Sequence, residues 1–412
     1  MMGFSGRDHG CEGVHDDLYA KVLALKQGRR KLALVALDLG SLDREGTQGI
    51  KQELKERYGL PPKNVLLACS HTHAGPVAAE RSYAEAPDPG YMASLREKIS
   101  QAVGDALGDL RPARLSFGLG STEIGVCRRL KTPEGVVMAP NPEGDVDRDL
   151  PVMLLSEPSG KPIALLFSAS CHPTTMKADN YLISAEWPGA ARRILEEHVG
   201  APALFLQGAG ADVKPRIVGD EGFRSGRFED VEAVGKEVAE DVLGVLEGGL
   251  REVEPRLCSV LLDASLPLEK PLSRTELERL ASDPDVPPPR RRWAGETLAL
   301  LQKRGELPRR TRCFVHFVRL GEDARIVGLE GEPCTGIGKR IKALFGDRGT
   351  VVVGYCNGSV AYLPTRRILE EGGYEAESYV YFGLPSRFAP GVEDKLAEAA
   401  MKAAERCGWA HV

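Results

Sequence analysis

The sequence lacks any apolar run near the roughly 20 residues that a membrane-spanning helix needs, and it has no strong charge of either sign. Fifty-four Lys and Arg face 59 Asp and Glu, a net charge of -5 at pH 7, so no global basic field favours nucleic acid. The first six residues lack the basic and apolar segments of a signal peptide. We therefore predict no transmembrane segment, no nucleic-acid partner and a cytoplasmic location.

Three chemical signatures are also missing. The nine cysteines form no C-x-x-C pair, which argues against a thiolate zinc site. Several lie in apolar runs, as small buried apolar groups do, and a reducing cytoplasm is the simplest compartment for them. No Gly-x-Ser-x-Gly elbow indicates a serine hydrolase, and Gly208-Ala209-Gly210 lacks the third glycine of a dinucleotide fingerprint.

What is present is typical of a soluble globular protein. With 42% apolar residues over 412 positions, the chain is long enough for a large core. Apolar runs alternate with amphipathic helical patterns over the first 250 residues, which predicts crossover units. We expect an α/β fold, a mostly parallel sheet flanked by helices, with the active site at the carboxyl ends of the strands. The predicted strands include residues 31–38, 65–69, 163–171, 203–206, 314–320, 324–329 and 350–355.

A proline- and arginine-rich stretch, residues 273–312, interrupts this pattern. We predict a single catalytic domain over residues 1–412 with a helical excursion here. Two interpretations stay open for the excursion. It is either a solvated helical segment or a cap whose residues 290–293, including Trp293, meet the substrate.

Histidines follow two of the predicted strands. His71 and His73 come just after residues 65–69, and His172 comes just after residues 163–171. Ligands bind beyond the carboxyl ends of strands in open α/β sheets, and residues two apart in an extended segment face the same way. This favours a metal site with one histidine as ligand and another as proton donor. The alternatives are surface histidines for the pair and a buried core residue for His172.

Two histidines alone do not make a catalytic zinc site, which usually holds three protein ligands. Glu330 and Glu332 follow another predicted strand, and Tyr362 lies in a polar loop after a further one. Each is a candidate for the same site. Each also has an ordinary alternative, a helix cap for the acids and a core position for Tyr362.

Together these motifs resemble the catalytic domain of the neutral, non-lysosomal ceramidases. The resemblance rests on Gly13-Val14-His15-Asp16-Asp17-Leu18-Tyr19-Ala20, Ser70-His71-Thr72-His73-Ala74-Gly75-Pro76, Asp145-Val146-Asp147-Arg148-Asp149, His172-Pro173-Thr174-Thr175, Gly208-Ala209-Gly210-Ala211-Asp212-Val213, Gly331-Glu332, Gly338-Lys339-Arg340, Cys356-Asn357 and Ala361-Tyr362. From this comparison of motifs we expect no counterpart of that family's immunoglobulin-like C-terminal domain.

The resemblance implies a zinc-dependent hydrolase of an amide bond. It implies Zn²⁺ held by His71, His172, Glu332 and Tyr362. It makes His73 the proton-handling residue, and Arg128 the family's arginine, with Arg129 one position away as the fallback.

The chain departs from the family at Lys214, which stands where the family has an active-site serine. A lysine cannot accept a hydrogen bond as a hydroxyl does, and it adds a positive charge. We expect Lys214 to face the pocket, with Asp212 or Glu186 as its protein partner, and to suit an anionic substrate better than ceramide. A small-molecule amide, lipid or anionic, is the expected substrate. The rival hypotheses are a metal-dependent esterase on the same site and a silent metal-binding protein.

Overall fold

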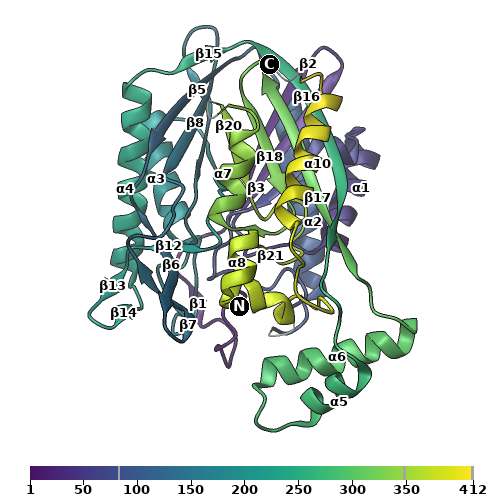
Figure 1. Ribbon diagram of the computed structural model, residues 1–412. Helices are drawn as coiled ribbons and strands as arrows, with labels where there is room; N and C mark the ends of the chain where they lie inside the picture. The colour runs from purple at the N-terminus through teal and green to yellow at the C-terminus, as the bar shows by residue number, and fades with distance from the viewer. Residues whose placement is uncertain (82–83, 347–348, 410–412) are drawn as a thin grey trace.

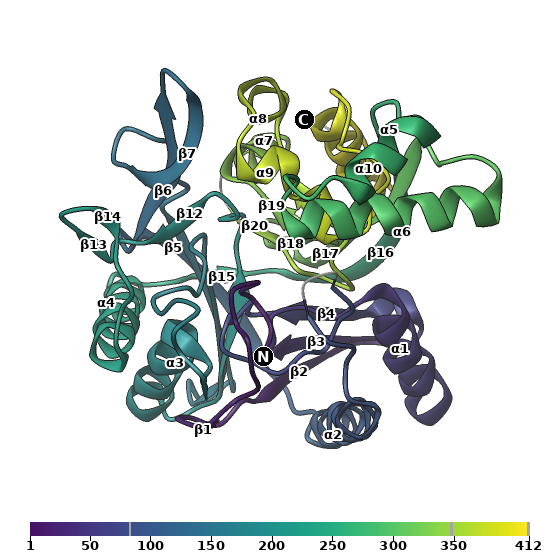
Figure 2. The ribbon, with the colours of Figure 1, turned by 90° about the horizontal axis from the view of Figure 1, so that it is seen from below.

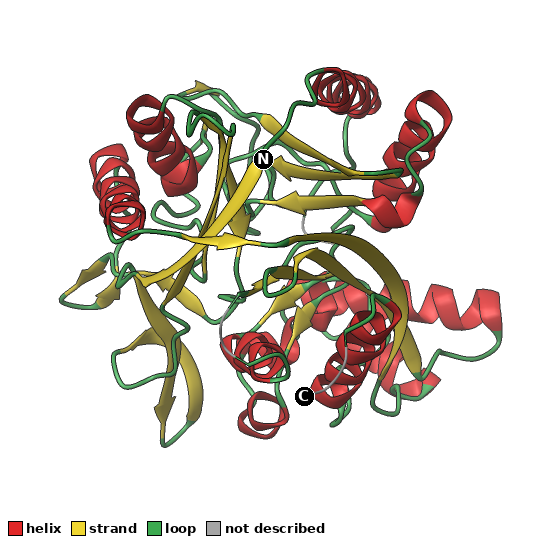
Figure 3. Cartoon of the chain, turned by 90° about the horizontal axis from the view of Figure 1, so that it is seen from above, coloured by secondary structure: helices red, strands yellow, loops and turns green. Residues whose placement is uncertain are grey.

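Three layers of sheet and helix form the molecule. In the computed structural model, which describes residues 1–81, 84–346 and 349–409, the strands lie toward the centre and most helices around the outside (Figure 3). None of the helices in these ranges is long and apolar enough to cross a membrane.

The first layer is formed by β2 (Ala20–Gln27), β3 (Arg30–Leu37), β4 (Val65–Cys69), α1 (Arg44–Tyr58) and α2 (Pro89–Gly108). The strand order is β2-β3-β4; β2 and β3 form an antiparallel hairpin, whereas β3 and β4 are parallel. Gly28 closes the hairpin with φ of 57°, a left-handed conformation that glycine adopts without steric cost. The two helices flank this sheet in Figure 2.

The second layer is formed by β5 (Arg114–Ser121), β8 (Asp149–Ser156), β9 (Pro162–Ala169), β11 (Ala203–Gln207), β15 (Arg251–Val253), α3 (Glu186–Val199) and α4 (Phe228–Glu247). Its strand order is β11-β9-β8-β5-β15. Only β9 and β11 are parallel neighbours in this sheet.

The third layer is formed by β16 (Pro255–Pro267), β17 (Arg310–Gly321), β18 (Arg325–Leu329), β20 (Thr350–Val353), α7 (Thr335–Ala343) and α10 (Val392–Arg406). Its strands run in the order β16-β17-β18-β20, and only β18 and β20 are parallel.

Short elements connect the layers and surround their strand ends. They are β1 (Gly13–Val14), β6 (Gly125–Thr132), β7 (Gly135–Asn141), β10 (Leu182–Ile183), β12 (Val213–Pro215), β13 (Val218–Gly219), β14 (Gly222–Phe223), β19 (Glu332–Pro333), β21 (Tyr362–Leu363), α8 (Arg366–Glu371), α9 (Tyr374–Glu377), and the 3₁₀ turns η1 (Pro62–Asn64) and η2 (Ser378–Tyr381). The small sheet β12-β6-β7 is antiparallel.

A common core joins the three sheets. Along β4, Leu66 and Ala68 face a cluster shared with β9, β11, β18 and β20, while Val65, Leu67 and Cys69 face α1 and α2. This period of two is expected for strands that are buried on both faces. Each sheet therefore contributes one face to the shared core and covers the other with its own helices.

The α/β class is confirmed, but the expected mostly parallel sheet is wrong. Nine of the strand pairings in the described ranges are antiparallel and five are parallel. Long apolar runs identify strands buried on both faces. β5, which alternates buried and wetter positions, and β7, none of whose residues is buried, give no such run and are not predicted by this rule.

The interrupting stretch does form helices, α5 (Arg274–Ser282) and α6 (Pro288–Arg304), which project from the body in Figure 1. Trp293 is not among the residues that line the pocket described below. It is buried, lies edge-on to Tyr379 with ring centroids 5.3 Å apart, and donates its indole N–H to the Leu384 carbonyl at 2.7 Å. The excursion is thus anchored by Trp293. The single domain over residues 1–412 and the cap stay predictions.

Most cysteines are buried thiols, as expected. The exceptions are Cys11, which is exposed, and a disulfide between Cys258 in β16 and Cys407 just after α10, which spacing alone did not reveal. Disulfides are uncommon in reducing compartments. The cytoplasmic location stays a prediction, and this bond is an argument against it.

Candidate metal centre and active site

The candidate site lies where parallel strands end. His71 follows β4, His172 follows β9, and Glu332 follows β18. Isolated bridges from Ala68 to Cys356 and from Gly208 to Val353 bring the ends of β4, β11 and β20 together. The expected location at carboxyl strand ends therefore matches the positions of these side chains. His71 and Glu332 line a pocket of about 180 Å³, and His172 is fully buried beside them.

Backbone strain concentrates at the same place. Of the four described non-glycine residues with positive φ, three follow these strands: His71 at 67°, Tyr355 at 55° and Asn357 at 61°. Such conformations cost of order 1–3 kcal/mol each and cluster at functional sites. The strain at His71 turns its imidazole onto the ring of Tyr355, whose centroid is 4.0 Å away.

His71 and His172 present matching ring nitrogens. The Nδ1 of His71 lies 2.6 Å from the Gly40 carbonyl, and the Nδ1 of His172 lies 2.8 Å from the Gly210 carbonyl. Each Nδ1 must carry the proton to donate to a carbonyl, so each Nε2 bears a lone pair. The rings lie 4.9 Å apart, and Nε2 of His172 is buried without a hydrogen-bond partner. A backbone carbonyl on Nδ1 is the usual support for a metal-ligating histidine.

Glu332 completes this convergence. Its Oε2 lies 3.5 Å from Nε2 of His71 and 3.7 Å from Nε2 of His172. Ligand atoms about 2.0–2.1 Å from a tetrahedral ion are roughly 3.4 Å apart. Both carboxylate-to-imidazole distances are thus within a few tenths of an ångström of the separation between two ligands of one ion.

The protonation states fit a cation. Burial would raise the pKa of Glu332, but His71 and His172 lower it to about 2. Burial lowers the pKa of His71 to about 4, against the pull of Glu332, and burial also lowers the pKa of His172. Neutral imidazoles and an ionised carboxylate are the forms that bind metal. Imidazole and carboxylate together suit zinc and neighbouring transition metals.

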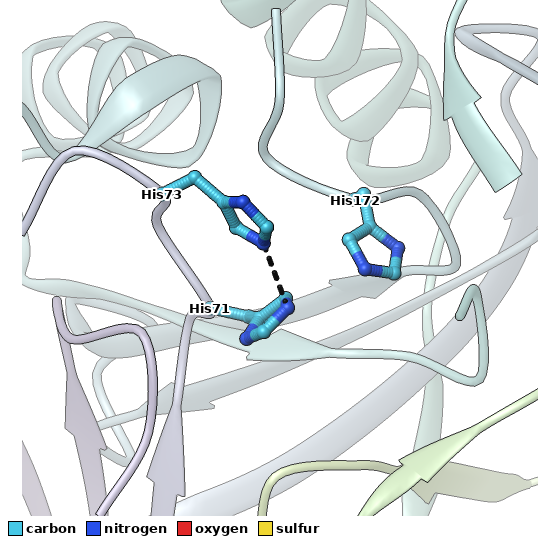
Figure 4. Close-up of side chains that lie close together, drawn as sticks. All are labelled: His71, His73 and His172. Atoms are coloured by element: carbon cyan, nitrogen blue, oxygen red, sulfur yellow. Dashed lines mark hydrogen bonds between the residues drawn. The ribbon is translucent and has the colours of Figure 1, made fainter. Parts of the chain in front are cut away.

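His73 lies against the same group (Figure 4). Its Nε2 is 3.0 Å from Nε2 of His71. Ligand atoms of His71, His73 and His172 all lie within 4.8 Å of one another, so His73 is placed either as a third imidazole ligand or as a proton carrier. Burial, then His71 and His172, lower its pKa well below the usual value. His73 is therefore neutral at rest and must accept a proton before it can donate one.

Tyr362 and Arg128 form the adjoining wall. Tyr362 pairs in parallel register with Glu332, and its hydroxyl accepts a hydrogen bond from Nη2 of Arg128 at 3.1 Å. Nε of Arg128 donates to Glu375 at 2.9 Å. Arg129 also binds Glu375, but Arg128 lines the pocket and Arg129 does not. The geometry favours Arg128 over the fallback.

Lys214 also lines the pocket, as expected. It lies in β12, is 6% exposed, and holds its ammonium 5.0 Å from the ring centroid of Phe223. Burial, with the charges of Arg128 and Lys177, lowers its pKa to about 8.

The expected protein partners of Lys214 are wrong. Asp212 instead accepts from the backbone N–H and the hydroxyl of Thr335 at the start of α7, at 2.7 and 2.8 Å. Glu186 accepts from the Thr175 hydroxyl at 2.8 Å and from backbone N–H groups. Both carboxylates are already used by nearby donors.

Several residues of the site gave no sequence signal. Tyr355 donates to Glu332 at 3.4 Å, and Glu375 holds Arg128 from a position about 250 residues along the chain. The ring of Phe4 lies edge-on to His73 at 4.8 Å, and Gly3 packs directly on His73. Only the position of Tyr355 at the end of an apolar strand could have indicated its role.

Comparison with known proteins finds curated relatives that are similar to about half of this chain. The curated neutral ceramidase of Pseudomonas aeruginosa is 26% identical over 241 residues, covering 53% of this chain and 34% of the relative. Neutral ceramidase 2 of Arabidopsis thaliana is 29% identical over 213 residues, covering 48% of this chain and 28% of the relative. The matched region is thus about a third of these relatives' lengths.

The fold is shared with solved ceramidase structures. The crystal structure of the Pseudomonas aeruginosa neutral ceramidase matches with a TM-score of 0.75 and 20% identity, over 100% of this chain and 72% of that one. A structure described as ceramidase complexed with C2 matches with a TM-score of 0.76 and 20% identity, over 98% of this chain and 72% of that one. A family model described as neutral/alkaline non-lysosomal ceramidase, N-terminal, matches residues 1–232, which is more than half of the chain. This chain belongs to the neutral/alkaline non-lysosomal ceramidase family.

Proposed function

We propose that this protein is a zinc-dependent hydrolase of an N-acyl amide bond. The observation that carries the proposal is the convergence of His71, His172 and Glu332 at distances suited to one ion. The relatives named neutral ceramidases support an amide as the bond cleaved. Tyr362 is the fourth candidate ligand, next to Glu332 on the neighbouring strand.

Zinc would supply Lewis acidity, polarising the scissile carbonyl and lowering the pKa of water from about 16 toward roughly 7. The protein residues handle orientation and protons. Neutral His73 accepts a proton from the attacking water and returns it to the leaving amine, the two halves of general acid–base catalysis. Its low pKa makes the returned proton readily available.

Arg128 positions the phenol of Tyr362 through its hydrogen bond. With the ion held by His71, His172 and Glu332 alone, the phenol of Tyr362 would instead be a donor beside the ligands and could stabilise the charge that develops on the carbonyl oxygen. Glu375 holds Arg128 in turn, so this wall of the pocket is a chain of contacts from Glu375 through Arg128 to Tyr362.

The test combines metal analysis with a substrate panel. Purified protein should contain about one zinc per chain and release fatty acid and amine from N-acyl amides, with the activity lost to a chelator. Glu332→Gln should lower zinc occupancy and activity together, since it removes the carboxylate charge. Glu306→Gln is the matched control, because Glu306 is exposed and lies just after α6, outside the site.

Two outcomes would replace the proposal. Ester cleavage without amide cleavage would make the protein a metal-dependent esterase using the same site. Zinc binding with no turnover of either panel would make it a silent metal-binding protein.

A further inference from the structure

Lys214 is a buried cation without an acidic partner. Its side chain is almost fully enclosed yet lines the pocket. No carboxylate lies within salt-bridge distance of its ammonium among residues 1–81, 84–346 and 349–409. An unpaired buried charge is strongly disfavoured, so the position calls for an anion from outside the chain.

The surroundings of Lys214 reinforce this need. The charges nearest to it include Arg128 and Lys177, both of the same sign. Glu186 attracts it from a distance, but that carboxylate is bound to the Thr175 hydroxyl and to backbone N–H groups. The ring of Phe223 offers only a cation–π contact. The local field therefore favours an added negative charge.

The pocket places such a charge close to the reacting bond. Lys214, His73 and Glu332 line the same cavity of about 180 Å³. Pockets that enclose drug-sized ligands are roughly 300–1,000 Å³, so this cavity holds only the reacting end of a substrate. Any group that reaches Lys214 from the metal ligands must lie within a few bonds of the scissile amide.

We propose that Lys214 forms an anion subsite, and that the amides bound here carry a carboxylate or a phosphate close to the scissile bond. This rests on the proposed function for the amide, while the anion itself rests on the pocket alone. Lys214 would donate charge-assisted hydrogen bonds to the anion's oxygens. The subsite would distinguish anionic amides from neutral ones of the same shape.

The test separates binding from turnover. Three ketomethylene isosteres of an N-acyl amide, which differ only in bearing a hydroxyl, a carboxylate or a phosphate on the amine side, are titrated by calorimetry into the wild-type protein. We expect one of the two anionic compounds to bind about 10- to 100-fold more tightly than the hydroxyl compound, the range for a hydrogen bond to a charged group. Which one binds more tightly identifies the anion.

The variants assign the preference to Lys214. Lys214→Met and Lys214→Gln should both remove it, with folding checked by circular dichroism and zinc content. Lys177→Met is the matched control, since it removes a neighbouring positive charge that does not line the pocket, and it should keep the preference. Equal affinity for all three compounds in the wild type, or a preference that survives in both Lys214 variants, would overturn the subsite.

Hydrolysis assays with the corresponding amides distinguish the two proposals. If the wild type prefers the anionic isosteres through Lys214 but cleaves no amide, the subsite stands and the proposed hydrolase is wrong. If the wild type cleaves neutral and anionic amides equally and the isosteres bind equally, the hydrolase stands and the subsite is wrong.

Discussion

Replacing Lys214 by methionine should stabilise the protein. A lysine ordinarily titrates near 10.4, whereas burial and the neighbouring cations lower the pKa of Lys214 to about 8. Since one pKa unit corresponds to 1.36 kcal/mol, keeping this residue charged in the folded state costs about 3 kcal/mol. Methionine keeps an unbranched chain of similar volume and removes the charge. At about 2.1 cal/mol/K per residue for the entropy of unfolding, a chain of this length should gain about 3–4 °C in Tm.

The gain should depend on pH in a defined direction. Because the folded pKa lies below the unfolded one, the cost of Lys214 is fully present below pH 8, where both states are protonated. It fades between about pH 8 and 10.4, and it vanishes above that, where both states are neutral. The difference in Tm between Lys214→Met and wild type should therefore shrink as pH rises through this window.

Thermal melts at pH 7 and pH 10, followed by circular dichroism, measure this difference. Lys402→Met is the matched control, since Lys402 is exposed on α10 and its replacement should change Tm little at either pH. A Lys214→Met variant that is no more stable than wild type at pH 7 would refute the reasoning. It would mean that the ammonium is solvated or paired in solution.

Two further changes test the packing of the site. Gly3→Ala would place a Cβ 2.6 Å from Cγ of His73, at a residue with φ of 112°, so His73 should shift and kcat should fall by about 10-fold or more. Gly10→Ala is the control, since nothing lies within 4 Å of the added Cβ, and it should leave kcat unchanged. Equal rates in both variants would show that the position of His73 does not depend on this contact. Glu375→Gln would leave the buried guanidinium of Arg128 without its carboxylate and should cost about 3–5 kcal/mol of stability in urea unfolding; a loss below about 1 kcal/mol would mean that Arg128 finds another partner.

The sequence predicted the parts of the site that follow local rules. His71 and His172 stand directly after apolar strands, and the carboxyl ends of such strands meet. Glu332 and Tyr362 were only candidates by pattern, and the family resemblance selected them. Their mutual position depends on the parallel pair β19–β21, two strands too short to be recognised from periodicity.

Other features depend on which of several donors a side chain binds, and the sequence does not reveal that choice. Asp212 was a reasonable partner for Lys214 two residues away, but the free N–H of Thr335 at the start of α7 lies closer. Helix starts leave such N–H groups unsatisfied, and carboxylates bind them readily. The sheet direction was misjudged for a related reason, since hairpin strands with a wetter face carry no long apolar run.

The site divides between two kinds of strand pairing. The candidate metal ligands follow β4, β9 and β18, each of which has a parallel neighbour. The pocket cations Arg128 and Lys214 instead come from the antiparallel pair β6–β12. β12 does contact a candidate ligand, since the Val213 carbonyl accepts from the backbone N–H of His172 at 3.1 Å. That bond uses backbone atoms alone, so the side chain of Lys214 can be replaced without removing it. We therefore expect zinc content to be the same in wild type and in Lys214→Met, even where their preference among amides differs, so that substrate charge and metal chemistry vary independently in this fold.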